Sequence, residues 1–139
     1  MFEKHNIVIV YGPKRSGKSI FVQFFLDILK REAKYITAIN IIMELYGRDF
    51  EEKKDYLDEL YKYNFLGIDD IDKVKLTGWK EEMMFYLIDK RISNLKKTII
   101  SCSVVPERLH LNLGNNIADK LLSEAYVIKL NENEYTNEE

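Results

Sequence analysis

The sequence predicts an α/β protein in which one parallel sheet is covered by helices on both faces. Short apolar segments rich in β-branched residues alternate along the chain with longer segments of helical periodicity. A glycine-rich loop joins the first predicted strand to the first predicted helix. The two prolines, Pro13 and Pro106, both fall in predicted loops. With 139 residues the chain has room for one domain of this class.

The individual elements follow from two periods, two residues for strands and 3.6 for helices. Residues 6–11 (NIVIVY) are apolar on both faces, which is typical of a buried parallel strand. The helix predicted at 17–31 is apolar around most of its circumference, so we expect it to be largely buried. The later elements are a strand at 34–40, a helix over 41–50, a helix at 51–63, a strand at 64–70, a helix at 79–95, a strand at 97–103, a short helix from Pro106, a helix at 116–123 and a strand at 125–130.

Composition bounds the class of protein. Hydrophobic residues make up 46% of the chain, which is enough for a packed interior. The net charge of −2 argues against a protein coated with basic residues for duplex DNA. No apolar run approaches the length of a membrane span, so we expect a cytoplasmic protein with no membrane contact. Residues 1–130 are predicted to form the domain, and residues 131–139 (NENEYTNEE) an acidic disordered tail.

The thiol and imidazole groups give no sign of a metal site or a nucleophile. The single cysteine, Cys102, lies in the apolar run TIISCSVV, where a buried structural thiol is expected. His5 and His110 are far apart in the sequence and have no zinc-ligand spacing.

The strongest functional signal is the segment GPKRSGKS, which fits the pattern G-x-x-x-x-G-K-[ST]. A buried strand precedes it and a helix follows, as a phosphate-binding loop requires. The loop N–H groups and the helix N-terminus would bind phosphates, Lys18 would reach the β- and γ-phosphates, and the Ser19 hydroxyl would ligate Mg²⁺. The alternative is a glycine turn with a solvated lysine. The predicted ATP-binding residues are Gly12, Pro13, Lys14, Arg15, Ser16, Gly17, Lys18, Ser19 and Ile20.

A pair of aspartates ends the predicted strand NFLGIDD. Ligands of an open parallel sheet bind beyond the carboxyl ends of its strands, where the phosphate loop also lies. We therefore expect Asp69 to hold the Mg²⁺ shell and Asp70 to polarise an attacking water. The alternative is an aspartate pair that opens a turn, since Asp72 follows closely.

Two serines end the predicted strand KTIISCS. Ser101 or Ser103 could contact the γ-phosphate or the attacking water. Ordinary capping of a strand-to-loop turn explains them equally well.

The order of elements resembles the core of the AAA+ ATPases, and more narrowly the bacterial and phage helicase loaders of the DnaC/DnaI type and the related IstB transposition ATPases. The likeness covers nearly the whole chain. It rests on GPKRSGKS, YITAINIIMEL, FLGIDDID and the stretch from Leu76 to Leu109, which contains a helix ending in the basic residue Arg91. The resemblance implies a three-layer P-loop fold with five parallel strands in the order 5-1-4-3-2. It leaves no counterpart for a helical lid domain.

The resemblance also implies roles for particular residues. Lys18 and Ser19 correspond to Walker A, and Asp69 and Asp70 to Walker B. Ser103 falls where the family has its sensor asparagine. Lys120 falls where the family has the arginine finger offered to a neighbouring subunit, although a surface-helix lysine is an equal alternative. Serine is shorter than asparagine and lysine lacks the planar fork of arginine, so we expect weak ATP hydrolysis.

These observations leave three classes of function open. The first is an ATP-binding AAA+ protein of DNA replication that resembles a helicase loader. Its partners would be a replicative helicase, copies of itself bound through the nucleotide face, and single-stranded DNA. The second is an ATPase-like binding module that occupies and inhibits a replication protein. The third, ranked last, is a small P-loop kinase, which would need an arginine-rich lid that is not visible between the strands.

A basic segment with aromatic residues is the candidate surface for single-stranded DNA. The alternative is a solvated helix face whose aromatic rings are buried. The residues of this segment are Lys73, Lys75, Lys80, Lys90, Arg91, Lys96 and Lys97, with Trp79, Phe85 and Tyr86.

Overall fold

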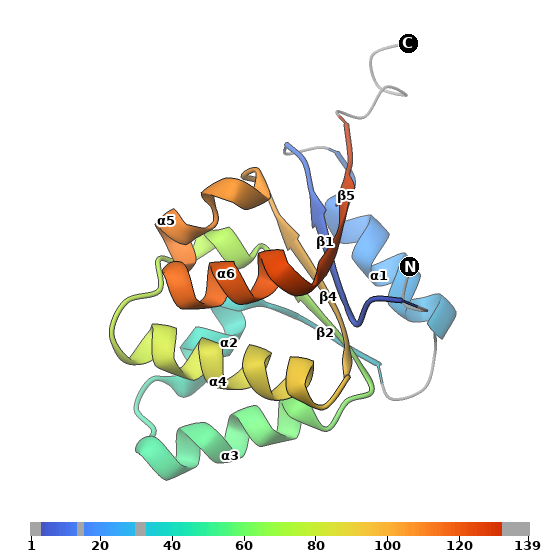
Figure 1. The fold of residues 1–139 in the computed structure, drawn as a ribbon. Helices are drawn as coiled ribbons and strands as arrows, with labels where there is room; N and C mark the ends of the chain where they lie inside the picture. Colours follow the sequence, from blue (N-terminus) through green and yellow to red (C-terminus); the bar gives the residue numbers. More distant parts are fainter. Residues whose placement is uncertain (1–3, 14–15, 30–32, 132–139) are drawn as a thin grey trace.

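A computed structural model describes residues 4–13, 16–29 and 33–131 of the chain. Five parallel strands form one sheet in the order β2-β3-β4-β1-β5 (Figure 1). Read from its other edge this is 5-1-4-3-2, which confirms the order implied by the AAA+ resemblance. The strands are β1 (Ile7–Tyr11), β2 (Ala33–Thr37), β3 (Phe65–Asp69), β4 (Lys97–Cys102) and β5 (Ala125–Lys129).

Helices cover both faces of the sheet, so the fold has the three predicted layers. Figure 1 shows α1 alone on one face and the later helices on the other. None of the helices in the described ranges is long and apolar enough to cross a membrane. The helical elements are α1 (Lys18–Leu29), α2 (Ala38–Leu45), α3 (Phe50–Tyr61), the 3-10 turn η1 (Ile71–Lys73), α4 (Trp79–Ser93), the 3-10 turn η2 (Pro106–Arg108), α5 (His110–Leu113) and α6 (Asn115–Glu124).

The second strand is shorter than predicted. The sequence indicates a strand at 34–40, but β2 ends at Thr37 and α2 begins at Ala38. The Thr37 hydroxyl accepts a hydrogen bond from the Asn40 N–H at 3.1 Å, which caps the first turn of α2. Such a cap contributes about 1 kcal/mol. The apolar residues after Thr37 therefore follow the helical period and not the strand period.

The helix predicted over 41–50 is also wrong at its end. Helix α2 stops at Leu45, and α3 begins at Phe50. Gly47 has φ +78°, a left-handed conformation that glycine adopts without strain. Asp49 and Glu52 then form a reciprocal capping box at the start of α3. These two local signals interrupt the apolar pattern between the helices.

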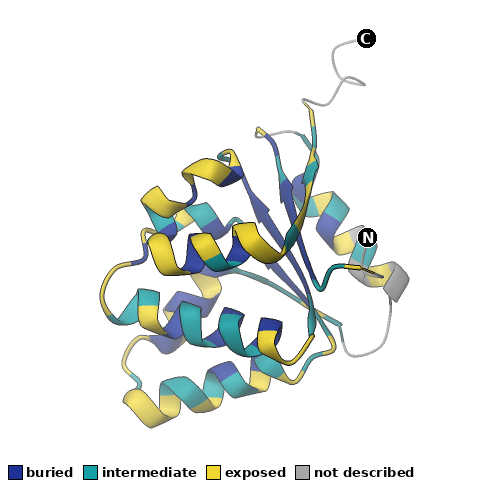
Figure 2. Ribbon diagram, viewed as in Figure 1, coloured by how far each residue is buried: buried dark blue, intermediate teal, exposed yellow. Residues whose placement is uncertain are grey.

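The hydrophobic core lies on both sides of the sheet. Side chains of β1 alternate between the two: Ile7 and Ile9 pack with α2 to α6, whereas Val8 and Val10 pack against α1. Figure 2 shows the central strands buried along their length. Burying one such side chain contributes about 1.5–3 kcal/mol. The prediction that residues 6–11 form a buried parallel strand is confirmed, and Cys102 is buried in the same core.

Arg91 lies in this interior and not on the basic surface that the sequence suggested. Its side chain is 0% exposed and extends from α4 towards the C-terminal end of α3 and the start of β4. Burial lowers the pKa of its guanidinium to about 10, so it stays charged at neutral pH. The C-terminal carbonyls of a helix carry partial negative charge and so suit this cation. The acceptors are the carbonyl oxygens of Leu60 (3.3 Å), Tyr61 (2.8 Å), Tyr63 (2.8 Å) and Lys97 (2.9 Å) and the hydroxyl of Thr98 (2.9 Å).

Candidate functional site

The carboxyl ends of β1, β3 and β4 meet the N-terminus of α1 at one edge of the sheet. The register pairs Tyr11 with Cys102 and Ile68 with Ile100, so the loops that leave these strands are neighbours. A cavity of about 320 Å³ opens among them. This cavity brings together residues that are as much as 86 positions apart in sequence. Its lining residues are Gly17, Lys18, Ser19, Ile20, Asp70, Lys73 and Ser103.

Two glycines shape the loop that precedes α1. A Cβ on Gly12 would lie 2.3 Å from the carbonyl oxygen of Leu130, so no larger residue fits there without a shift of the backbone. Gly17 has φ +87°, and a Cβ there would meet no atom within 4 Å. It therefore supplies the backbone turn, with open space beside it, from which α1 begins. Lys14 and Arg15, two of the predicted ATP-binding residues, lie outside the described residues.

Lys18 is held over this loop. Its side chain is 7% exposed, and its ammonium donates to the carbonyl oxygens of Gly12 (2.7 Å) and Pro13 (3.0 Å). Two hydroxyls of the predicted site, those of Ser16 and Ser103, are buried and have no hydrogen-bond partner in the described structure. Leaving a buried hydroxyl unpaired costs about 1–3 kcal/mol. Oxygen atoms of an anionic ligand would satisfy such groups, so these residues fit a bound phosphate chain.

The predicted metal pair, Ser19 and Asp69, is in direct contact. The Ser19 hydroxyl donates to Asp69 Oδ2 at 2.6 Å, although the two residues lie on α1 and β3. Asp69 is 1% exposed and accepts two further hydroxyls, from Tyr35 on Oδ2 and from Ser101 on Oδ1. The Ser101 hydroxyl also accepts the Asp70 N–H at 2.9 Å. Ser101 thus holds the two aspartates in place and does not line the cavity.

A divalent cation at this point would need ligands beyond the protein. Ser19 and Asp69 offer oxygen atoms, the ligand type that Mg²⁺ prefers. Among the described residues, no group of three or more His, Cys, Asp or Glu side chains could hold a metal ion. The donor set therefore fits an Mg²⁺ that arrives with phosphates and keeps part of its water shell.

Asp70 enters the cavity through an unusual backbone conformation. Its φ of 54° and ψ of 51° are left-handed, which is uncommon outside glycine and is found at functional sites. Partial burial raises the pKa of the Asp70 carboxyl, and the charge of Asp69 raises it further; Lys73 and Lys18 act in the opposite direction. The 3-10 turn η1 follows directly after Asp69 and Asp70. The alternative prediction, that this aspartate pair opens a turn, is therefore also correct for the backbone.

Asp72, which follows β3, is in contact with Ser103, which follows β4. Both carboxylate oxygens of Asp72 lie 3.2 Å from the Ser103 N–H, which donates to them. This contact places the Ser103 side chain at the cavity wall. The structure thus positions Ser103 where the predicted sensor role needs it, and that role stays a prediction.

Lys120 lies away from this cavity. Its ammonium forms an ion pair with Asp89 of α4 at 3.3 Å, and its side chain is about one-third exposed. Its predicted role concerns the nucleotide of a neighbouring copy, so the contact within one chain leaves that role a prediction. The same contact occupies the ammonium that the role would use.

Sequence reasoning did not assign Tyr35 or Lys73 to the site. The sequence predicts Tyr35 only as part of a strand, and its contact with Asp69 depends on the pairing of β2 with β3. Burial raises the pKa of its hydroxyl, and the hydrogen bond to Asp69 raises it further. The sequence assigns Lys73 to the basic segment, but Lys73 lines the cavity because η1 turns back beside Asp70. The i, i+3 spacing from Asp70 was the available signal for Lys73.

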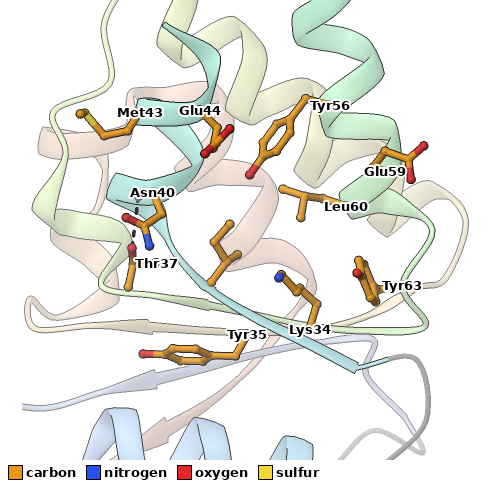
Figure 3. Close-up of a pocket in the computed structure, with 11 residues that line it drawn as sticks. Lys34, Tyr35, Thr37, Asn40, Met43, Glu44, Tyr56, Glu59, Leu60 and Tyr63 are labelled. Atoms are coloured by element: carbon orange, nitrogen blue, oxygen red, sulfur yellow. Dashed lines mark hydrogen bonds between the residues drawn. The ribbon is translucent and has the colours of Figure 1, made fainter.

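A larger cavity, of about 670 Å³, lies at the β2 edge between this strand, α2 and α3 (Figure 3). It includes no residue of the phosphate loop. In Figure 3 Lys34 points towards α3, whereas Tyr35 lies on the opposite side of β2, towards α1. Tyr35 borders this edge cavity and also contacts Asp69, so it is shared by the two regions.

The predicted surface for single-stranded DNA is largely engaged in packing. Phe85 and Tyr86 are half-buried against the core, and Lys90 forms an ion pair with Asp58 at 2.9 Å. The Tyr86 hydroxyl donates to the same carboxylate at 2.7 Å. With Arg91 buried as well, the alternative of a solvated face with packed aromatic rings describes this segment better.

Comparison with known proteins supports the fold. No protein-family model and no curated protein matches the chain. Among solved structures, DnaA from Aquifex aeolicus bound to AMPPCP superposes with a TM-score of 0.80 at 12% identity, over 94% of this chain and 42% of that one. The DnaC helicase loader superposes with a TM-score of 0.77 at 21% identity, over 94% and 81% of the two chains. DnaI gives a TM-score of 0.78 at 16% identity, over 93% and 75%.

The chain shares its fold with these DnaA, DnaC and DnaI structures. At these identities the likeness establishes the architecture, and this chain spans about two-fifths of the DnaA structure's length. This fold places the predicted phosphate loop, the Asp69–Asp70 strand and the end of β4 at one edge, where the cavity lies. Within the described residues no helical lid follows β5.

Proposed function

We propose that this chain is a cytoplasmic AAA+ domain of DNA replication that binds ATP with Mg²⁺ and hydrolyses it slowly. The contact between the Ser19 hydroxyl and Asp69 carries the proposal, because it joins the predicted Walker A and Walker B motifs beside one cavity. A phosphate loop and an acidic strand placed together in this way suit a nucleoside triphosphate. The likeness to DnaA in complex with AMPPCP adds support.

Different groups of the chain would bind the phosphates, the Mg²⁺ ion and the attacking water. Backbone N–H groups at the start of α1 face the phosphates, and Lys18 supplies a positive charge from the loop. Ser19 and Asp69 would hold Mg²⁺, which neutralises phosphate charge when bound. The Asp70 carboxylate lines the cavity, where it would orient a water and accept its proton.

Two features support slow hydrolysis. Ser103 offers a short hydroxyl where the family has an asparagine side chain, and Lys120 is engaged with Asp89. Lysine also lacks the rigid fork with which arginine binds a phosphate in the transition state. An arginine finger contributes about 10³–10⁵ in rate, so its replacement has a large effect.

A role in replication rests on the fold and its neighbours. Those neighbours include DnaA bound to AMPPCP and single-stranded DNA, and the DnaC helicase loader. We infer a replicative helicase or another replication protein as partner, and self-association through the nucleotide face. Single-stranded DNA is a weaker candidate here, because Lys90, Tyr86 and Arg91 are engaged within the domain.

Nucleotide binding is tested by titrating a fluorescent ATP analogue with Mg²⁺ into the wild type, Lys18→Ala and Lys34→Ala. Lys34 is a matched control, since it lines the separate edge cavity. We expect Lys18→Ala to weaken binding at least about tenfold, the effect of losing one charge-assisted hydrogen bond. Lys34→Ala should bind as the wild type does. Equal affinities in all three proteins would refute the proposed site.

The Lys120–Asp89 contact also favours a second candidate, a binding module that occupies a replication protein without turnover. Phosphate release separates the two functions, with Lys18→Ala as the background. Turnover above that background supports the ATPase. Tight ATP binding with no turnover, alone or with a replicative helicase, supports the binding module.

A further inference from the structure

Lys73 lines the cavity from the turn that follows β3, whereas Gly17 to Ile20 line it from the start of α1. It ends the 3-10 turn η1, where its N–H donates to the Asp70 carbonyl at 3.0 Å. That turn starts from the left-handed Asp70, which directs the chain back towards the cavity. Ser103 is tied to this turn because its N–H donates to Asp72, so Lys73, Asp70 and Ser103 line the same side of the cavity.

The two lysines of the cavity are held differently. Lys18 is buried and donates to the carbonyls of the loop. Lys73 is exposed and forms no ion pair with another described residue, so its ammonium is available to a ligand. Lys120, the other lysine considered for a phosphate role, is occupied by Asp89.

The position of Lys73 in the cavity indicates which phosphate of the proposed ATP its ammonium would contact. Loop amides and Lys18 would contact the β- and γ-phosphates from the side of α1, whereas a water-orienting carboxylate belongs on the far side of the terminal phosphate. Lys73 shares its wall with that carboxylate, Asp70, and with the unpaired hydroxyl of Ser103. A cation on this side would contact a triphosphate and leave a diphosphate largely untouched.

We propose that Lys73 binds the terminal phosphate of the nucleoside triphosphate, so that the chain distinguishes triphosphate from diphosphate with a cation of its own. The inference rests on the proposed ATP site and adds a residue and a selectivity to it. A lysine acts here as a point charge, which needs no planar geometry. It would partly replace the cation that an AAA+ neighbour supplies.

The test compares the affinities of AMPPCP and ADP, each with Mg²⁺, for the wild type, Lys73→Met, Lys73→Arg and Lys75→Met. Lys75 is a matched control, two residues on and exposed but not part of the cavity. We expect Lys73→Met to weaken AMPPCP binding about tenfold, as loss of one charge-assisted contact does. ADP binding should change less than about twofold on the same scale. Lys73→Arg should keep the preference for AMPPCP, and Lys75→Met should match the wild type.

The outcomes separate this inference from the proposed function. If the wild type binds both nucleotides but Lys73→Met weakens both equally, or neither, Lys73 does not serve the terminal phosphate and the ATP site stands. If the wild type binds neither nucleotide, both proposals fail. Thermal unfolding of each variant is measured alongside; because Lys73 is exposed, the substitutions should leave the unfolding midpoint unchanged.

Discussion

Replacing Arg91 by methionine tests whether the buried guanidinium holds the helical layer to the sheet. Its five hydrogen bonds reach the end of α3 and the start of β4. Methionine keeps much of the volume but donates nothing. Two acceptors, the Leu60 carbonyl and the Thr98 hydroxyl, are bonded in buried surroundings, and the other three contacts are partly accessible to water.

The expected cost follows from this division. Both buried acceptors keep a weaker second partner, since the Leu60 carbonyl accepts the Tyr63 N–H at 3.4 Å and the Thr98 hydroxyl donates to the Lys96 carbonyl at 3.5 Å. Losing the guanidinium therefore costs about 1–2 kcal/mol at each of them, below the upper limit of about 3 kcal/mol for an unpaired group, while accessible carbonyls can rehydrate. We therefore expect Arg91→Met to lower the free energy of unfolding by about 2–4 kcal/mol, a large share of the roughly 5–15 kcal/mol of a typical domain.

Urea unfolding followed by far-ultraviolet circular dichroism measures this loss. Lys90→Met is the matched control, because the adjacent lysine forms a partly exposed ion pair with Asp58. Such a pair contributes at most about 1 kcal/mol. If Arg91→Met is no less stable than Lys90→Met, the guanidinium does not clamp these elements and the reasoning from its contacts is refuted.

Three further predictions concern the aspartates. Tyr35→Phe removes one of the three hydroxyl donors to Asp69, so Mg²⁺-dependent nucleotide binding should weaken several-fold relative to binding in EDTA. The control is Tyr63→Phe, at the edge cavity, which should leave this binding unchanged. Equal effects in the two variants would contradict a role of Tyr35 in positioning Asp69. Because the pKa of Asp70 is raised above 3.8 and its ionised form is needed as base, single-turnover hydrolysis should fall as pH drops through a midpoint above that value. Asp70→Asn should abolish turnover yet retain nucleotide affinity; an active Asp70→Asn would exclude Asp70 as the base.

The sequence predicts those parts of the site whose residues lie close together along the chain. Gly12 to Ser19 are contiguous, and Asp69 and Asp70 end an apolar strand, so motif and strand position together place them at the same edge. The contribution of Tyr35 depends on the pairing of β2 with β3, which no local pattern specifies. The sequence does not distinguish the buried Arg91 from the partly exposed lysines around it, because its partners are backbone carbonyls of other segments.

The position of β1 in the sheet has a consequence for how the chain folds as it is synthesised. Although β1 comes first, it lies between β4 and β5, so both of its neighbours are made after residue 96. A strand that is apolar on both faces therefore stays unpaired until β4 has been translated, which exposes it to aggregation. Leu130 donates its N–H to the Tyr11 carbonyl at 2.8 Å, and its own carbonyl packs over Gly12. The phosphate loop, encoded near the start of the chain, is thus completed only by residues close to its end.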